Sequence, residues 1–196
     1  MNYIIHLTQR CNLRCKYCYE NKNEKEISFE NIQKLIDNEI KEKRDYVVLT
    51  FYGGEPLLRK DLIYDTIDYI KSQKSKTKFY FGMTTNGTLL DEQFIRYIEQ
   101  NQFLNIAYSF DGLEKTQNLN RVTLNGEGTF DIVDNNARKL LKSHKNVVAM
   151  VVVTKNNIKM LKENIEYLIK IGFKNFNLLF DYLQDWQDED LEIIKE

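Results

Sequence analysis

Three cysteines, Cys11, Cys15 and Cys18, lie within eight residues of one another and are the only cysteines of the 196-residue chain. Thiolates at these offsets can converge on one small centre, and as soft ligands they suit zinc or an iron–sulfur cluster. A zinc site or a cluster held by four cysteines of this chain is excluded, because no fourth cysteine exists. The set predicts a metal centre with one open position, where we expect the chemistry.

The segments that must position these cysteines alternate between short β-branched or aromatic runs and longer amphipathic stretches. This alternation predicts six βα repeats, the last cut short near Glu196, and therefore an α/β fold with a parallel sheet, helices outside and right-handed crossovers. A doubly wound sheet and a full or partial barrel both fit, and both put ligand-binding loops at the carboxyl ends of the strands. The predicted strands are residues 3–8, 46–51, 78–83, 104–110, 147–153 and 175–180.

The ends of the predicted helices are marked by residues that cap or stop them. Ser28 is a candidate N-cap, Asp61 and Asp91 each open an amphipathic segment, and Gly172 is a C-terminal stop. The apolar positions recur with helical spacing across residues 29–40, 62–70, 94–98, 130–141 and 158–169.

Small or polar residues follow each of the first four predicted strands. Because the carboxyl ends of parallel strands meet at one edge of a sheet, we expect these residues to face a common mouth. The four segments are the cysteine loop, Gly53-Gly54-Glu55-Pro56, Thr84-Thr85-Asn86-Gly87 and Ser109-Phe110-Asp111-Gly112.

Composition narrows the functional classes. The net charge is −1 and the basic residues are scattered, so no nucleic-acid partner is expected. No apolar run approaches about 18 residues and no signal-peptide pattern opens the chain, so we expect no membrane partner and a cytoplasmic location. Clustered cysteines of odd number indicate reduced thiols. Residues 1–196 are expected to form one domain, and His6 and His144 have no partnered spacing that would suggest metal binding.

The motif series resembles that of the radical S-adenosylmethionine (radical SAM) superfamily, and most closely its peptide and protein maturases, among them the sulfatase-maturing enzymes. The resemblance implies a partial (β/α)6 barrel, a [4Fe–4S] cluster, and reductive cleavage of S-adenosylmethionine to a 5′-deoxyadenosyl radical. It further implies hydrogen abstraction from a peptide or protein substrate, with oxidation or thioether crosslinking, and an external electron donor of the flavodoxin or ferredoxin type. The motifs concerned are Cys11-x3-Cys15-x-Tyr17-Cys18, Gly53-Gly54-Glu55-Pro56, Thr85-Asn86-Gly87, Ser109-Phe110-Asp111-Gly112 and Asn120-Arg121.

The resemblance assigns the three cysteines to three irons of the cluster, and the fourth iron to the amine and carboxylate of S-adenosylmethionine. Gly53 and Gly54 would let the backbone approach this ligand closely, and Glu55 would accept from its ammonium. An ordinary turn with an exposed carboxylate is the alternative for Glu55. Two roles fit Tyr17, which are packing near the adenine and shielding the cluster from water.

Ser109 and Arg121 correspond to a serine and an arginine that bind the methionine carboxylate in these maturases, and a surface salt bridge is the alternative for Arg121. Asn86 fits either a contact to the ribose or a turn, and Asp111 fits either an orienting role or a substrate contact. Leu178 fits either the adenine face or core packing.

Two other functions remain open at this level. The first is a small-molecule substrate or the activation of a glycyl-radical enzyme by the same chemistry. The second is a non-catalytic iron–sulfur binding module, either an electron carrier or a metal-binding interaction module. Maturases of this type usually carry further cysteines in a C-terminal extension for auxiliary clusters. The chain has none, so it is either the core of a longer protein or a short member.

Overall fold

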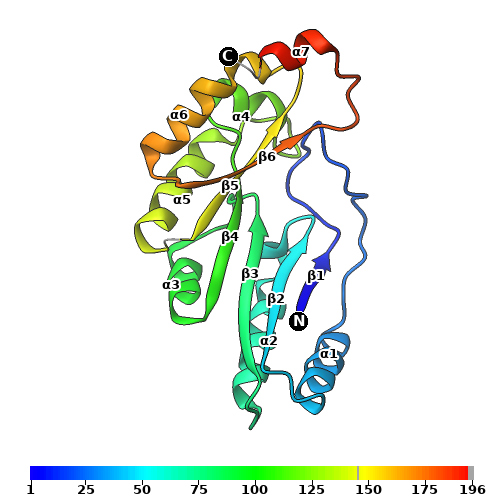
Figure 1. Cartoon of the computed structure of the whole chain (residues 1–196). Coiled ribbons are helices and arrows are strands. Elements are labelled where there is room, and N and C mark those ends of the chain that lie inside the picture. Colours follow the sequence, from blue (N-terminus) through cyan, green and yellow to red (C-terminus); the bar gives the residue numbers. More distant parts are fainter. Residues whose placement is uncertain (145, 194–196) are drawn as a thin grey trace. The chain divides into compact units, whose positions relative to one another are not determined.

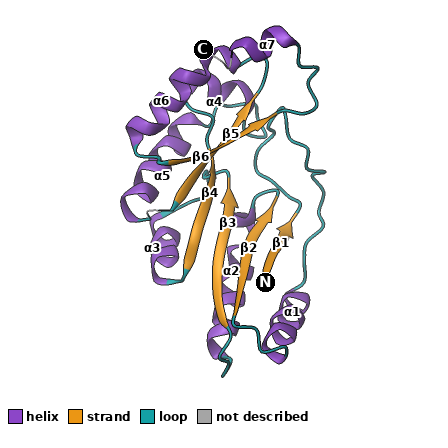
Figure 2. Ribbon diagram, viewed as in Figure 1, coloured by secondary structure: helices purple, strands orange, loops and turns teal. Residues whose placement is uncertain are grey.

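Strands and helices alternate along the chain in the predicted order (Figures 1 and 2). The computed structural model describes residues 1–144 and 146–193. All six predicted strands are present, with ends that differ by at most two residues from the prediction. The strands are β1 (Asn2–Thr8), β2 (Tyr46–Gly53), β3 (Lys78–Thr85), β4 (Phe103–Ser109), β5 (Val147–Val153) and β6 (Asn175–Phe180).

The helices agree with the five predicted amphipathic segments, and two further helices, α4 and α7, complete the set in the described part of the chain. The α-helices are α1 (Phe29–Lys41), α2 (Lys60–Ser72), α3 (Glu92–Gln100), α4 (Glu114–Asn120), α5 (Phe130–Ser143), α6 (Leu161–Ile171) and α7 (Asp188–Glu192), and short 3-10 helices are η1 (Pro56–Arg59) and η2 (Ile158–Met160). No helix in residues 1–144 and 146–193 is long and apolar enough to cross a membrane.

The strands follow one another in the sheet in the order of the chain, β1-β2-β3-β4-β5-β6. The pairs β1–β2, β2–β3 and β5–β6 are parallel. A doubly wound sheet reverses its strand order at a switch point, so the sequential order rules that alternative out. Because β1 and β6 stand at the two edges, the sheet is not closed. The predicted α/β fold with an open, barrel-type parallel sheet is confirmed.

The contacts of the chain divide it into two compact units. Unit 1 consists of Met1–Asn12, Glu20–Thr85 and Leu89–Ile106, and unit 2 of Leu13–Tyr19, Asn86–Thr88 and Ala107–Glu196. Strand β4 contributes its first four residues to unit 1 and its last three to unit 2. That residues 1–196 form a single domain stays a prediction.

Unit 1 is held together by one packed face of its strands. In β2, Val47, Leu49 and Phe51 are fully buried, while the residues between them are only half-buried. The ring of Phe51 stacks on Phe81 with centroids 6.0 Å apart, and Phe81 lies 5.6 Å from Phe103. Aromatic pairs at such distances add to the area that they bury. The three rings connect β2, β3 and β4 beneath the edge from which the loops emerge.

Unit 2 repeats this arrangement around β5, in which alternate residues from Val147 to Val153 are buried. Tyr108 and Phe110 of the β4 end pack against Phe173, with ring centroids 6.1 and 6.3 Å apart. The buried Tyr108 hydroxyl donates to the Val133 carbonyl oxygen at 2.8 Å, which satisfies a polar group that would otherwise be costly to bury. The end of β4 is thereby fixed to α5.

Three of the four predicted helix signals function as expected. The Ser28 hydroxyl accepts from the Asn31 N–H, the Asp91 carboxylate accepts from the Phe94 N–H, and Gly172 ends α6 in the left-handed region at φ +119°. Asp61 lies in the first turn of α2 rather than at its cap, because the chain between Pro56 and Arg59 already turns as η1.

The cap at Asp91 gives a pH-dependent contribution to stability. Burial disfavours the charged carboxylate, but hydrogen bonds from Lys60 and from the Phe94 N–H outweigh it, so the pKa of Asp91 is lowered. A lowered folded-state pKa stabilises the fold above the unfolded value, near 3.9, and this stability is lost as the pH falls through the folded value.

We therefore expect Asp91→Ala to lower the free energy of unfolding at pH 7 by about 1 kcal/mol. Asp91→Asn retains a good N-cap and loses only the titrating group, so it should cost less at pH 7 and show a smaller drop in stability between pH 5 and pH 3. Urea unfolding followed by circular dichroism at both pH values measures this. Equal pH dependence of the wild type and Asp91→Asn would contradict the assignment.

Candidate functional site

The first part of the cysteine loop, in unit 1, leaves β1 through a β-bulge. The pairing register with β2 shifts between His6 and Thr8, and such a bulge bends the strand. The Thr8 hydroxyl accepts from the Arg10 N–H at 3.1 Å and donates to Glu26 Oε1 at 3.3 Å. The chain is thus turned and held between Thr8 and Arg10, directly before Cys11. His6 packs its ring on Tyr52 at 4.9 Å, a structural role within β1.

Gly53 and Gly54 lie directly against this turn. The Gly54 N–H donates to the Thr8 carbonyl and the Glu55 N–H to the Arg10 carbonyl, both at 2.9 Å. A Cβ on Gly54 would lie 2.2 Å from the Arg10 carbonyl oxygen, and one on Gly53, at φ +141°, would lie 2.2 Å from that of Thr8. The two glycines are required because the chain's own backbone approaches them. An approach to a ligand at the same residues stays a prediction.

Glu55 is completely buried, so the alternative of an exposed turn carboxylate is wrong. Its Oε1 accepts from the Leu57 N–H at 3.0 Å and from the Thr85 hydroxyl at 2.8 Å. A buried carboxylate needs such donors to compensate for the water it has lost. The side chain is therefore fixed by the ends of β2 and β3, and its predicted role toward a ligand ammonium stays a prediction.

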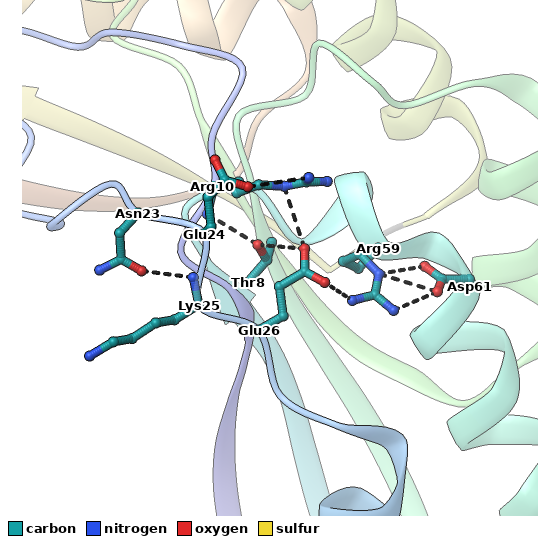
Figure 3. Close-up of polar contacts among 8 residues, drawn as sticks. All are labelled: Thr8, Arg10, Asn23, Glu24, Lys25, Glu26, Arg59 and Asp61. Atoms are coloured by element: carbon teal, nitrogen blue, oxygen red, sulfur yellow. Dashed lines mark hydrogen bonds and ion pairs between the residues drawn. The ribbon is translucent and has the colours of Figure 1, made fainter.

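A network of charged side chains braces the same turn from outside (Figure 3). Glu26 pairs with Arg10 at 3.4 Å and with Arg59, and Arg59 also binds both carboxylate oxygens of Asp61. The hydrogen bond from Arg59 lowers the pKa of Asp61. The network joins the residue before Cys11 to the start of α2. Its members are dispersed in sequence and their charges are common, so sequence reasoning missed it.

The second part of the cysteine loop, Leu13–Tyr19, belongs to unit 2 and runs alongside the segment that follows α4. The Arg14 N–H donates to the Val122 carbonyl at 2.8 Å and the Lys16 N–H to the Asn120 carbonyl at 3.0 Å. The side chain of Leu13 is buried, and the Cys18 N–H closes a turn on the Cys15 carbonyl at 3.2 Å. The backbone that carries Cys15 and Cys18 is therefore held by hydrogen bonds.

Tyr17 points from this loop to a buried ion pair. Its hydroxyl donates to Asp111 Oδ2 at 2.5 Å, and the Arg121 guanidinium lies 5.3 Å from the ring centroid. Burial raises the pKa of Tyr17 well above its ordinary value; Arg121 opposes the rise, and Asp111 and Cys15 add to it. The phenol is therefore protonated and able to donate.

Arg121 and Asp111 are both buried and bind one another at two points, from Nε to Oδ2 at 3.1 Å and from Nη2 to Oδ1 at 2.9 Å. Arg121 Nη2 also donates to the Met150 carbonyl, and Asp111 Oδ1 accepts from the Val152 N–H. The surface salt bridge considered for Arg121 is wrong, because the pair is enclosed. Asp111 binds both Tyr17 and Arg121, and the choice between an orienting role and a substrate contact stays a prediction.

The other predicted cofactor residues of unit 2 lie in simpler surroundings. Asn86 Oδ1 accepts from the N–H and hydroxyl of Thr88, at 3.0 and 2.7 Å, which is a turn. Ser109 is the last residue of β4 and is half-buried. Leu178 is 40% exposed on β6, so its alternative role in core packing is wrong. The roles of all three toward a ligand stay predictions.

Comparison with known proteins decides the family. The family model described as the radical SAM superfamily matches residues 5–168, more than half of the chain. The chain belongs to the radical SAM superfamily. Members of this family use a [4Fe–4S] cluster and S-adenosylmethionine, as the motif series implied.

Individual relatives agree with this membership. An uncharacterized protein of Methanocaldococcus jannaschii is 32% identical over 97% of this chain and 65% of its own length. A cysteine-type anaerobic sulfatase-maturating enzyme of Clostridium perfringens is 29% identical over 84% of this chain and 47% of its own length. The solved structure of native anSMEcpe with bound AdoMet and the Cp18Cys peptide has the same fold, with a TM-score of 0.87 at 24% identity over 98% of this chain and 56% of that one. The chain thus spans about half to two thirds of the length of these proteins.

The residues of this radical SAM chain fit an iron–sulfur cluster by their donor chemistry. All three cysteines are half-buried and none forms a disulfide, so the loop supplies three of the soft sulfur donors that iron takes in a cluster. Within the described residues, no group of three or more His, Cys, Asp or Glu is arranged around a single ion. A cluster makes no such demand, because each of its irons takes one thiolate.

Proposed function

We propose that this chain carries the catalytic core of a radical SAM enzyme that modifies a peptide or protein substrate. The observation that carries the proposal is the cysteine loop itself. Three cysteines without a disulfide stand on one loop. The turn before Cys11 is bonded to Gly54 and Glu55, and the later part of the loop is bonded to Asn120 and Val122. Ligands held in this way bind a metal group with a smaller loss of conformational entropy.

In this proposal Cys11, Cys15 and Cys18 hold the [4Fe–4S] cluster, which supplies the electron for reductive cleavage of S-adenosylmethionine. Glu55 accepts a hydrogen bond from the ammonium group of S-adenosylmethionine, and the backbone at Gly53 and Gly54 comes close to the same ligand.

In unit 2, the methionine carboxylate is bound by Ser109 and Arg121. The nucleoside is contacted by Asn86 at the ribose and by Tyr17 and Leu178 at the adenine. Arg121 directs Nε and Nη2 at Asp111 and the Met150 carbonyl, so a carboxylate ligand would bind at Nη1. Ser109 suits a ligand, because its hydroxyl has no hydrogen-bond partner within the described residues.

A peptide or protein substrate is supported by the relationship to the sulfatase-maturating enzyme and by the fold shared with a peptide-bound structure. An external donor of the flavodoxin or ferredoxin type would deliver the electron, and a cytoplasmic location remains part of the proposal. The 5′-deoxyadenosyl radical would take one hydrogen atom from the substrate and leave as 5′-deoxyadenosine. The substrate radical would then pass one electron to an oxidised protein of the flavodoxin or ferredoxin type and one proton to water, so that the substrate loses two hydrogen atoms.

The test is anaerobic reconstitution of the full chain with iron and sulfide, followed by dithionite and S-adenosylmethionine. We expect iron and sulfide in equal amounts, as a [4Fe–4S] cluster requires, and release of 5′-deoxyadenosine. Cluster binding without 5′-deoxyadenosine would favour a non-catalytic electron carrier, and the absence of a cluster would reject the proposal.

The substrate class needs a second assay. Short peptides that contain cysteine or serine are incubated with the reconstituted protein, and mass spectrometry looks for loss of two hydrogen atoms. Steady formation of 5′-deoxyadenosine with every peptide unchanged would contradict the peptide proposal and favour a small molecule or a glycyl-radical enzyme as substrate.

A further inference from the structure

We infer that Tyr17, Asp111 and Arg121 form a positioning network that holds the Cys15–Cys18 turn ready for the cluster and keeps the charge beside Cys15 balanced. The inference rests on the proposed function, because it takes Cys15 and Cys18 to be cluster ligands. None of the three residues needs to touch the cluster for this role.

The first support is the number of bonds that converge on Asp111. Its completely buried carboxylate accepts from Arg121 twice, from the Tyr17 hydroxyl and from the Val152 N–H. A buried carboxylate with charge-assisted partners on both oxygens is rigid and costly to disturb. The Tyr17 side chain is thereby tied to the end of β4 and to β5.

The second support is the position of Tyr17 between two cysteines. The backbone bonds from Arg14 and Lys16 hold the loop before Tyr17, and the turn from the Cys18 N–H to the Cys15 carbonyl encloses it. The hydroxyl bond to Asp111 therefore fixes the part of the loop that carries both thiols. Partners that orient a metal ligand from behind commonly change metal affinity by about 10- to 100-fold.

The third support is electrostatic. Arg121 lies between Asn120 and Val122, the two residues that accept from the loop on either side of Cys15. Burial is the largest single influence and disfavours the charge of Arg121, but Asp111, Tyr17 and Cys15 together outweigh it and raise the pKa of Arg121. Arg121 thus stays positive near a thiolate ligand, and Asp111 cancels that charge locally. Removal of Asp111 alone would leave a positive charge that favours the reduced, more negative cluster.

The test compares these three residues with a second tyrosine–aspartate–arginine set, which lies on α5 and α6. In α5 and α6, the Tyr167 hydroxyl donates to Asp134 at 2.6 Å and Arg138 pairs with Asp134 at 2.8 Å. Tyr17→Phe and Asp111→Asn are therefore matched by Tyr167→Phe and Asp134→Asn. The readouts are iron release from the reconstituted protein to a chelator and the reduction potential from an electron paramagnetic resonance titration.

We expect Tyr17→Phe to lose iron about 10- to 100-fold faster than the wild type with little change in potential, because the substitution is neutral. Asp111→Asn should raise the potential, and the double variant Asp111→Asn/Arg121→Gln, which restores the charge balance, should return it toward the wild-type value. Tyr167→Phe and Asp134→Asn should match the wild type in both readouts.

Equal iron release by Tyr17→Phe and Tyr167→Phe would overturn the positioning role. Equal potentials for Asp111→Asn and the double variant would overturn the charge role. If Asp111→Asn does not fold, because it leaves Arg121 buried without a counter-charge, the double variant is compared with the wild type, and a changed potential then counts against charge balance. Failure of the wild type to take up a cluster would instead reject the proposed function.

Discussion

Alanine at Cys11, Cys15 or Cys18 is expected to abolish stable cluster binding and to reduce 5′-deoxyadenosine formation by more than about 100-fold, because loss of a direct ligand exceeds the effect of losing a supporting residue. A [4Fe–4S] cluster with only two protein thiolates has two irons open to water and chelators. The measurement is iron content and 5′-deoxyadenosine after anaerobic reconstitution of each single variant.

The fold itself should survive these substitutions. The cysteines are half-buried, and the loop is held by backbone hydrogen bonds that alanine retains, so the apo variants should unfold at the urea concentration of the apo wild type. Titration of the apo proteins with a thiol reagent should show one reactive thiol fewer in each variant. A variant that keeps both its cluster and its activity would show that the substituted cysteine is no ligand.

Gly54→Ala is expected to lower the free energy of unfolding by about 3 kcal/mol or more, at the upper end of overpacking effects. The new methyl group would meet the Arg10 carbonyl oxygen at 2.2 Å and that of Gln9 at 2.7 Å. These are backbone atoms, which cannot move aside by a change of rotamer. The turn before Cys11 must then shift, so reconstituted cluster content should fall as well.

A matched control separates the clash from backbone strain. Gly126 is in the left-handed region at φ +83°, and a Cβ there meets nothing within 4 Å, so Gly126→Ala should cost only about 1–2 kcal/mol, the price of that conformation. Gly53→Ala combines both effects at φ +141° and should be at least as damaging as Gly54→Ala. Urea unfolding of the three variants measures the series. If Gly54→Ala and Gly126→Ala lower the free energy of unfolding equally, the backbone of the turn at Gln9 and Arg10 can shift without an energetic penalty, which would contradict the prediction.

Most of the fold could be predicted from the sequence because its signals are local. Strands β5 and β6 were predicted with their observed ends, and Ser28 and Asp91 cap the helices that follow them. Helix α4 was missed, because its seven residues lie between two motifs and present no long apolar stripe. The order of the strands in the sheet could not be predicted from the sequence either. Doubly wound and barrel-type sheets have the same alternation of strands and helices and differ only in which strands pair.

The site was predictable in its residues but not in their partners. Spacing identified the cysteines and Gly53-Gly54-Glu55, and the structure supplies the reason for the glycines in the backbone at Thr8 and Arg10. Arg121 was expected in a surface salt bridge or at the methionine carboxylate. It lies buried against Asp111, which excludes the surface salt bridge, and its role toward a ligand stays a prediction. No local pattern in the sequence shows that an arginine pairs with a carboxylate ten residues earlier in the chain.

The irregular pairing between His6 and Thr8 bears on attempts to transplant the thiol-bearing segment into another scaffold. The direction in which the chain departs is set inside the strand, by the extra residue and by the contacts of Thr8 and Arg10 with Gly53, Gly54 and Glu26. In a chimera that contains only the three cysteines and the residues between them, the loop would leave its strand in a different direction. A transplanted segment therefore has to begin in the second half of β1 and has to include Gly53 and Gly54.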